Sequence, residues 1–282
     1  MTNQLLTLPA VKELLERAGT VPRRSLGQNF VVDPNTVRRI ARLAGVGPGD
    51  RVVEIGAGLG SLTAALAETG ATVVAVETDG RLVSLLREVL SPYPSSVEVV
   101  HADARRMDWN ALLGGTGWHL VANLPYNIAT SLVLTVLDEV PGVSQLLVMC
   151  QREAAERLAA EPGSGAYGAV SVRVAIHADA ELAGAVPATV FYPRPEVESA
   201  LVRITRRADA LESKLRAEIE RLVTAAFAHR RQMLRRTLRN AFDDADAKLV
   251  AADIDPTERP ERLGLAQWAR LATVSLGTRQ QG

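Results

Sequence analysis

Short apolar runs alternate with helix-like segments along the first half of the chain, and this alternation limits the folds open to it. Runs rich in Val, Ile and Leu are expected to form strands at 51–55, 72–77, 97–101, 118–123 and 144–150. Helical periodicity falls between them, at 61–69, 81–90 and 128–139. Strands joined through helices run parallel, with helices on both faces of the sheet. The pattern therefore predicts an α/β fold.

Two later apolar stretches, 169–178 and 198–204, are expected to complete the sheet. The segment 191–195 is excluded from its interior, because its two prolines lack the amide hydrogen that strand pairing needs. Near the N-terminus, residues 8–18 have the apolar spacing of an amphipathic helix. Asp33 before Pro34 predicts the N-cap of another helix.

After about residue 206 the strand signals stop. Helices are expected at 211–228, 231–242 and 265–275. We therefore predict two domains, with boundaries at 1–205 and 206–282. The first holds the sheet with an N-terminal extension, and the second is small and all-helical.

Composition narrows the class of protein. Hydrophobic residues make up 47% of the 282 residues, and no apolar run approaches the ~20 residues of a membrane-spanning helix. The N-terminus lacks the apolar core of a signal peptide, so we expect a cytoplasmic protein without a membrane partner. The single cysteine, Cys150, excludes disulfides within the chain, and the four histidines lack ligand spacing. No metal site is expected.

A buried strand runs into a glycine-rich turn at 52–60, where glycines allow a ligand to approach the backbone closely. Glu77 ends the next strand, at the place of a carboxylate that accepts hydrogen bonds from ribose hydroxyls. A dinucleotide cofactor or a plain tight turn are alternatives. S-adenosylmethionine is favoured by the G-x-G-x-G spacing of Gly56, Gly58 and Gly60 and by the preceding acid Glu54. It is also favoured by Asp103 after the third strand, a candidate acceptor for the cofactor's adenine amine, with a solvated strand-end aspartate as the alternative.

The most specific motif is Asn123-Leu124-Pro125-Tyr126, which follows a buried strand. An adenine amine is a poor nucleophile, and acceptors for its hydrogens favour a more tetrahedral nitrogen. The Asn123 side-chain oxygen and the Leu124 carbonyl are candidate acceptors, and Tyr126 is a candidate stacking surface for the base. Phe191 is a second candidate stacking wall, with an ordinary core aromatic as the alternative. A turn with a packed tyrosine is the non-functional interpretation of the motif.

These motifs together resemble the bacterial small-subunit ribosomal RNA adenine dimethyltransferase family, over about residues 22–275. The matching segments are 24–31, 54–60, 123–128, 162–168, 191–200 and 226–231. The resemblance implies a Rossmann-like S-adenosylmethionine methyltransferase fold that dimethylates two adjacent adenines near the 3′ end of 16S rRNA during ribosome biogenesis. It implies a partner in the small ribosomal subunit or its precursor, and we expect a monomer. The implied cofactor contacts are Asn29, Val31, Gly56, Glu77, Asp103 and Asn123, and the implied target-adenine contacts are Asn123 and Tyr126.

Some positions depart from the family's usual residues: Leu26, Val31, Ala57, Arg194 and Glu196. The departures at 194 and 196 bear on contacts with the RNA, whereas the cofactor motifs are intact. Net charge is zero, but six arginines and no acid lie between 221 and 240. Among them we expect Arg230, Arg231 and Arg235 to contact RNA phosphates from one or two adjacent helical faces, although a solvated basic face is the alternative.

Three other functions compete with this interpretation. One is methylation of an adenine in 23S rRNA, as in macrolide-resistance enzymes. Another is a non-catalytic factor in ribosome assembly or transcription, which the intact cofactor motifs disfavour. A nicotinamide oxidoreductase is disfavoured because no proton-donating pair accompanies the glycine-rich turn.

Overall fold

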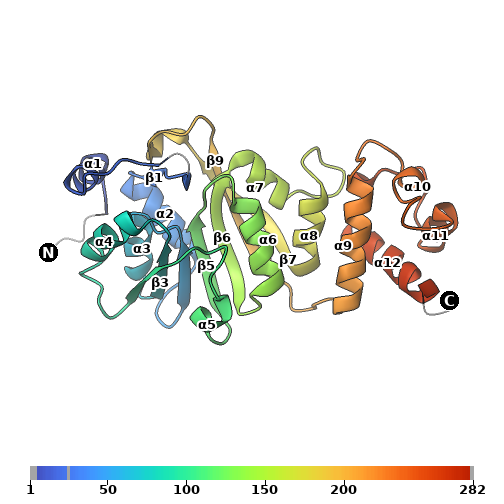
Figure 1. The fold of residues 1–282 in the computed structure, drawn as a ribbon, viewed down its shortest axis with the longest axis horizontal. Coiled ribbons are helices and arrows are strands. Elements are labelled where there is room, and N and C mark those ends of the chain that lie inside the picture. The colour runs from blue at the N-terminus through green and yellow to red at the C-terminus, as the bar shows by residue number, and fades with distance from the viewer. Residues whose placement is uncertain (1–4, 24–25, 280–282) are drawn as a thin grey trace. The chain divides into compact units, whose positions relative to one another are not determined.

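The computed structural model describes residues 5–23 and 26–279, and these form two compact units. Unit 1 comprises Met1–Ala155 and Glu181–Arg206, and unit 2 comprises Glu156–Ala180 and Arg207–Gly282 (Figure 1). The units differ from the predicted division in two respects, and the smaller is that Arg206 falls in unit 1. Residues Glu156–Ala180, expected in the first domain, group with the helical unit.

The main sheet has the strand order β4-β3-β2-β5-β6-β9-β7. All five predicted strands are present: β2 (Arg51–Ile55), β3 (Thr72–Glu77), β4 (Val97–His101), β5 (Trp118–Asn123) and β6 (Val143–Gln151). These five run parallel. The predicted last strand is β9 (Ser199–Arg206), which pairs antiparallel with β6 and separates it from the edge strand β7 (Ala178–Val186). Strand order reverses between β2 and β5, and such a switch point is where open α/β sheets bind ligands.

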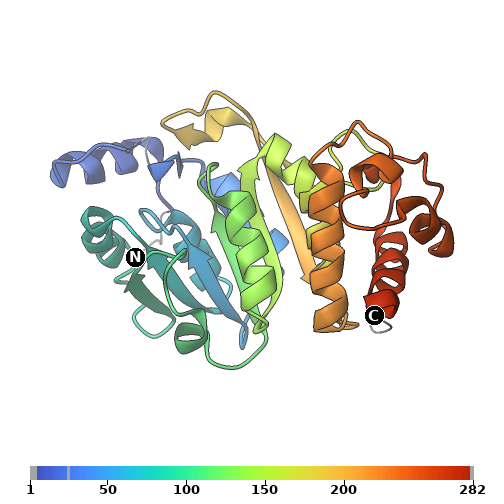
Figure 2. The same ribbon diagram turned by 45° about the vertical axis from the view of Figure 1, so that its right-hand side comes forward.

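Helices cover both faces of the sheet, as α6 (Ala129–Glu139) lies on one side and α2 (Pro34–Ala44) and α3 (Ser61–Ala67) on the other (Figures 1 and 2). The remaining helices that begin in unit 1 are α1 (Leu8–Arg17), α4 (Gly80–Val89), α5 (Trp109–Leu113) and α7 (Arg152–Leu158), with a 3-10 turn at Ala188–Val190. The Asp33 carboxylate caps α2 by accepting from the Thr36 amide at 2.9 Å, as predicted.

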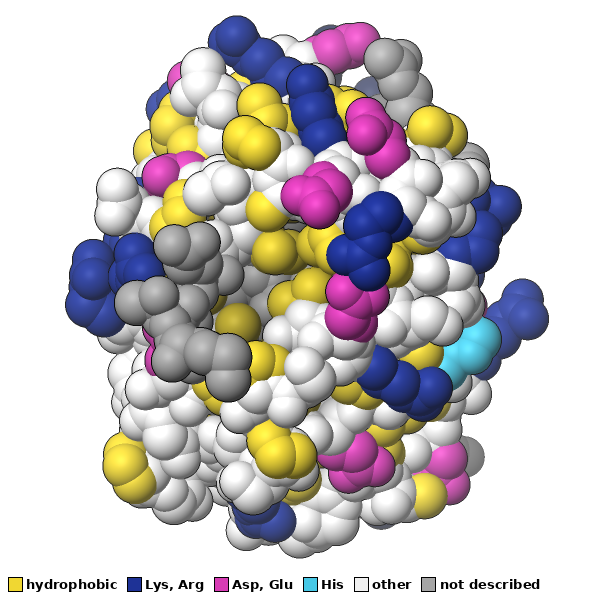
Figure 3. Space-filling model, turned by 90° about the vertical axis from the view of Figure 1, so that its left-hand side faces the viewer, with side chains coloured by type: hydrophobic (Ala, Val, Ile, Leu, Met, Phe, Trp, Pro, Cys, Tyr) yellow, Lys and Arg dark blue, Asp and Glu magenta, His cyan; other side chains and the backbone are white. Residues whose placement is uncertain are grey.

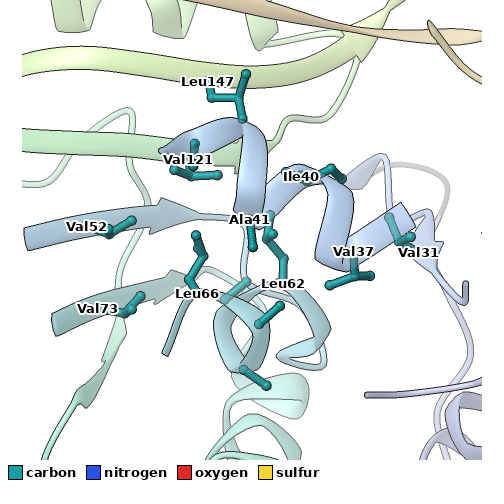
Figure 4. Close-up of a cluster of buried hydrophobic side chains, with 14 of the residues drawn as sticks. Val31, Val37, Ile40, Ala41, Val52, Leu62, Leu66, Val73, Val121 and Leu147 are labelled. Atoms are coloured by element: carbon teal, nitrogen blue, oxygen red, sulfur yellow. The ribbon is translucent and has the colours of Figure 1, made fainter. Parts of the chain in front are cut away.

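Apolar side chains from α2, α3 and the sheet interlock in one core cluster (Figure 4). Ile40 of α2 and Leu66 of α3 are almost fully buried in it, together with Val52 and Val121 from the two strands at the switch point. Burying one such side chain contributes about 1.5–3 kcal/mol. The cluster therefore holds α2 and α3 against this face of the sheet.

A second, two-stranded sheet joins β1 (Phe30–Val31) to β8 (Phe191–Tyr192), with Phe30 opposite Tyr192. The segment 191–195 thus lies outside the main sheet, as its prolines required. The pairing holds residues of the N-terminal segment beside the loop that carries Arg194 and Glu196.

Unit 2 is helical apart from the first residues of β7. Its helices are α8 (Ala169–His177), α9 (Ser213–Phe227), α10 (Leu234–Thr237), α11 (Ala245–Ala251) and α12 (Leu265–Arg279), with a 3-10 turn at Pro260–Arg262. They surround a core centred on the fully buried Trp268. Among the described residues, no helix is long and apolar enough to span a membrane.

Two predicted elements of unit 2 were wrong. Of the strand predicted at 169–178, residues 169–177 form α8 and Ala178 begins β7. The β-branched residues alternate, but Val172 and Ile176, one helical turn apart, pack together in the unit 2 core. The helix expected at 231–242 is reduced to α10, and α11 was not foreseen. The amides of Leu234 and Arg235 donate to the carbonyls of Glu258 and Pro256 instead of to a preceding helical turn.

Candidate active site

A cavity lies at the switch point, where β2 ends in the glycine-rich turn and β5 ends beside it. The turn, the carboxyl ends of β2, β3 and β5, α2 and residues 26–31 line it. Figure 3 views the side of unit 1 that carries α1 and α4, and this face is hollowed near its centre, with hydrophobic side chains inside the hollow and both signs of charge around it. The predicted residues Asn29, Val31, Gly56, Glu77 and Asn123 all line the cavity, and so does Gly58.

The glycine-rich turn needs glycine for two reasons. Gly58 has φ +59°, which favours glycine, and a Cβ there would come within 3.1 Å of the Phe30 ring. Gly58 also donates its amide to Glu77 Oε2 at 2.8 Å, which fixes the turn to the end of β3. The turn therefore presents bare backbone to the cavity.

Glu77 is placed to bind a ligand and to hold the turn. Its two oxygens accept from the amides of Gly58 and Asp79, each at 2.8 Å, and the residue is 5% exposed. Burial raises the pKa of this carboxyl, and the backbone amides oppose that rise. Each oxygen has a second lone pair, so the carboxylate retains capacity for hydroxyl donors from the cavity.

Glu54 is a second acid in the cavity wall, which the sequence singled out only as a sign of the cofactor class. It is 2% exposed, and burial raises its pKa to about 8, with the negative charge of Glu77 adding to the rise. Within the described residues its Oε2 has no hydrogen-bond partner. A buried acceptor without a partner is costly unless a bound group supplies a donor. The acceptor groups of the cavity therefore fit a polar ligand that carries hydrogen-bond donors, such as S-adenosylmethionine.

The N-terminal segment closes one side of the cavity. Gly27 lies so close to the turn after β5 that a Cβ would come within 2.7 Å of the Pro125 Cβ. Gln28 donates to the Asp79 carboxylate at 2.9 Å and accepts from the Arg23 amide at 2.8 Å. Neither contact of Gln28 was foreseen, although its place inside the matched segment 24–31 was a usable signal. These bonds explain how residues far from the glycine-rich turn in sequence reach it.

Asn123 lies where the cavity meets the motif turn. Its Nδ2 donates to the Asn29 carbonyl at 3.0 Å, so its Oδ1 is the atom left to accept from another group. The adjacent Leu124 is 1% exposed and its amide donates to the Met149 carbonyl at 2.9 Å. Within the described residues, no hydrogen bond uses the Leu124 carbonyl. Both predicted acceptors are therefore held in place and available.

Asp103 lies apart from the cavity wall. Its carboxylate pairs with the Arg105 guanidinium at 2.8 Å, and this hydrogen bonding lowers its pKa. Phe191 is also placed differently from the expected stacking wall, because it is 4% exposed and packs in the main core cluster of unit 1. The assigned roles of these two residues stay predictions.

A groove adjoins the cavity and shares residues 27–29 with it. Tyr126 and Asn127 line one part of the groove, Gln151 another, and the loop 193–197 the rest. This groove contains Arg194 and Glu196, two of the positions that depart from the family's usual residues. The cavity and the groove together give room for a cofactor and for a second ligand on either side of residues 27–29.

The arginine segment, residues 230–235, lies in unit 2 and differs from its predicted form. Arg230 and Arg231 are in the turn after α9, and only Arg235 is on a helix. Arg230 donates to the Gly165 carbonyl at 2.8 Å, and Arg235 lies 3.8 Å from the Asp246 carboxylate. The prediction that these arginines share one or two adjacent helical faces was therefore wrong, although all three arginines are exposed.

Comparison with known proteins points to one family. The model of the family described as ribosomal RNA adenine dimethylase matches residues 20–275. A protein of Kineococcus radiotolerans named ribosomal RNA small subunit methyltransferase A is 47% identical over 96% of this chain and 91% of its own length. One of the same name from Thermobifida fusca is 46% identical over 95% of this chain and 96% of its own length.

Solved structures agree on the fold. The 23S rRNA methyltransferase ErmE is 29% identical, with a TM-score of 0.71 over 87% of this chain and 98% of its own. A dimethyladenosine transferase from Plasmodium falciparum is 22% identical, with a TM-score of 0.75 over 85% of this chain and 94% of its own. The predicted Rossmann-like methyltransferase fold is confirmed. A cavity that fits S-adenosylmethionine lies beside the Asn-Leu-Pro-Tyr turn, and the family match covers nearly the whole chain. The chain therefore belongs to the ribosomal RNA adenine dimethylase family.

Proposed function

We propose that the protein transfers methyl groups from S-adenosylmethionine to the N6 amines of two adjacent adenines near the 3′ end of 16S rRNA. The observation that carries the proposal is the Asn123–Tyr126 turn, whose first residue lines one hollow and whose last residue lines another. One is the cavity with the glycine-rich turn and Glu77, and the other is the groove lined by Tyr126. Relatives 41–47% identical over most of the chain, all named for the small ribosomal subunit, support the choice of substrate.

Cofactor binding would use the backbone of the turn at Gly56 and Gly58 and the carboxylate of Glu77 for the ribose hydroxyls. Asn29 and Val31 would close the cavity from the N-terminal segment, as their place in its wall supports. Asp103 would have to leave its pair with Arg105 or share it in order to contact the cofactor's adenine. When bound, the cofactor supplies a methyl group already activated by its sulfonium.

The protein's part in the transfer is to position the adenine amine and to accept its hydrogens. Asn123 Oδ1 and the Leu124 carbonyl are two acceptors at one turn, and the Asn29 carbonyl holds the amide of Asn123 in place. Acceptors for the two hydrogens favour a more tetrahedral nitrogen whose lone pair is available. The methylated nitrogen is acidic, so no strong base is required, and catalysis rests on positioning and electrostatics.

The base must leave any helix to reach this site, because an adenine paired within a duplex cannot present its amine to the cavity. Tyr126, half-buried in the groove, would stack on the extruded base. Such stacking contributes about 1–3 kcal/mol per base. The arginine segment would add phosphate contacts that increase affinity without reading sequence. We further propose a monomer that acts on the small subunit or its precursor in the cytoplasm.

The rival substrate, 23S rRNA, is favoured by the likeness to ErmE, but that likeness is lower in identity than those to the small-subunit relatives. Mass spectrometry of rRNA fragments separates the two. Small and large subunits from cells lacking this gene would be incubated with the purified protein and S-adenosylmethionine. We expect dimethyladenosine at two adjacent positions in a 3′-terminal 16S fragment. Methylation only of 23S rRNA, or of neither, would reject the proposal.

A further inference from the structure

One hydrogen bond in the groove joins two residues that are far apart in the sequence. The Tyr126 hydroxyl and the Ser199 hydroxyl lie 2.9 Å apart. Ser199 is fully buried, whereas Tyr126 is half-buried and lines the groove. The bond therefore connects the groove surface to a side chain that no ligand reaches directly.

The topology of the sheet shows what this bond does to the tyrosine. Tyr126 follows β5, Ser199 begins β9, and β6 lies between these two strands. In the antiparallel register Ser199 is opposite Gln151, the last residue of β6. The tyrosine side chain thus reaches across the carboxyl end of β6, and its ring is held at both ends, by its backbone turn and by Ser199.

A buried serine hydroxyl needs a partner in any protein, so the bond by itself has a purely structural explanation. Two features point further. The partner belongs to the Asn123–Tyr126 motif turn, and it lines the groove that adjoins the cavity. Burial also raises the pKa of Tyr126, so its hydroxyl stays neutral and keeps this bond throughout the working pH range.

We propose that Ser199 is a positioning residue for methyl transfer, which fixes the ring of Tyr126 at the angle that stacks the target adenine beside Asn123. This inference rests on the proposed function. A tyrosine free to turn about χ1 would still offer a stacking surface, but the adenine amine would occupy the reactive position for less of the time. The loss would be most evident in the second transfer, where the amine already carries a methyl group and has less room.

The test compares Ser199→Ala, Tyr126→Phe and the double variant with wild type, using small ribosomal subunits from cells that lack the methylation. Both single variants remove the same hydrogen bond and keep the ring. We expect each to lower kcat by about five- to tenfold, the size expected for one lost hydrogen bond. The double variant should match the single ones. KM for the subunit and cofactor affinity should stay unchanged, and the fraction of monomethyladenine should rise.

Two matched variants control for the chemistry of the changes. Tyr93→Phe removes a hydroxyl that bonds Glu68, and Ser144→Ala removes one at the other end of β6. Neither residue lines the cavity or the groove, and both variants should behave as wild type. Thermal unfolding checks the fold, and Tyr126→Phe decides the question if Ser199→Ala fails to fold.

Unchanged kcat and product ratio in Tyr126→Phe would overturn the inference, and so would additive losses in the double variant. The proposed function would survive either result as long as wild type dimethylates 16S rRNA. Absence of 16S methylation by wild type would instead reject the proposed function itself, so the two failures are distinguishable.

Discussion

The cofactor cavity of unit 1 and the arginine segment of unit 2 hold their functional side chains in opposite ways. In the cavity, Glu54 and Glu77 are buried, and Asn123 is oriented by a backbone carbonyl. In the arginine segment the side chains are exposed, and two of the three are engaged, by the Gly165 carbonyl and near Asp246. Loss of one buried partner leaves another group unsatisfied, whereas exposed contacts are replaced by water.

This contrast predicts a graded response to substitution. Single changes in the cavity should each have large and specific effects, because the groups are few and held in place. Single changes in the arginine segment should be small and should depend on salt, because phosphate contacts add up over several cations.

Asn123→Ala should cause the largest loss, about 10²–10³-fold in kcat, the size found when one oriented group is removed from a reaction site. Cofactor affinity should change much less. Single-turnover methyl transfer and isothermal titration measure the two effects, and Asn110→Ala, exposed on α5, is the control. If Asn123→Ala turned over as fast as wild type, the Asn123 side chain would have no role in methyl transfer.

Glu77→Ala should weaken S-adenosylmethionine binding by about 10- to 100-fold, since hydrogen bonds to a charged acceptor contribute about 1.5–3 kcal/mol. It also leaves the Gly58 amide without its acceptor. Calorimetric titration gives the affinity, and Glu98→Ala, exposed on β4, is the control. An affinity equal to that of wild type would contradict the ribose assignment.

Glu54→Gln should change how stability depends on pH. The folded pKa of about 8 lies above the ordinary value of 4.5, so the folded protein binds one more proton than the unfolded chain between these values. The contribution of protonated Glu54 to the free energy of unfolding is fully present below pH 4.5. It is lost as pH rises to about 8, by up to about 1.4 kcal/mol per pH unit.

Urea unfolding of the free protein at several pH values measures this slope, and the glutamine variant should lose it. Glu98→Gln should keep the wild-type slope, since that side chain is exposed. Parallel curves for wild type and Glu54→Gln would mean that the buried carboxyl is already ionised in the folded protein.

The arginine segment should show the smallest single effects. Arg231→Ala should lower RNA affinity a few-fold and reduce the salt slope by about one. Arg235→Ala should do less, because Asp246 already offsets its charge. Filter binding to small subunits at several salt concentrations measures both, with Arg87→Ala on α4 as control. A larger loss of RNA affinity for Arg235→Ala than for Arg231→Ala would contradict the prediction that Asp246 offsets the charge of Arg235.

The sheet and its glycine-rich turn were predictable because buried parallel strands need continuous apolar residues. The bounds of β2, β3, β4 and β5 match their apolar runs residue for residue. Residues 169–178 were wrongly predicted as a strand, because alternating β-branched residues favour strands. In the folded protein Val172 and Ile176 are buried together in the helical core of unit 2. Local preference is decisive only where tertiary packing does not compete with it.

The site was predictable in its residue types but not in its connections. The glycines, Glu77 and the Asn123–Tyr126 motif are adjacent to strand ends, so their shared edge followed from the parallel sheet. The bonds of Gln28 with Asp79 and of Tyr126 with Ser199 join residues 51 and 73 positions apart. Asp103 was assigned from its place after a strand and from the family resemblance, and Phe191 from its place before the Pro-rich loop. In the structure Asp103 pairs with Arg105, and Phe191 packs in the core.

The sequence by itself determined the α/β class and the positions of the five parallel strands along the chain. It also determined the types of residue that follow the ends of these strands. These depend on periodicity and residue type, which are local properties of the chain. Only the tertiary structure decided which acceptors stay unpaired, which arginines are already engaged and which side chain orients another. These depend on distances between residues remote in sequence, and a hydrogen bond or an ion pair exists only once folding has brought its two groups together.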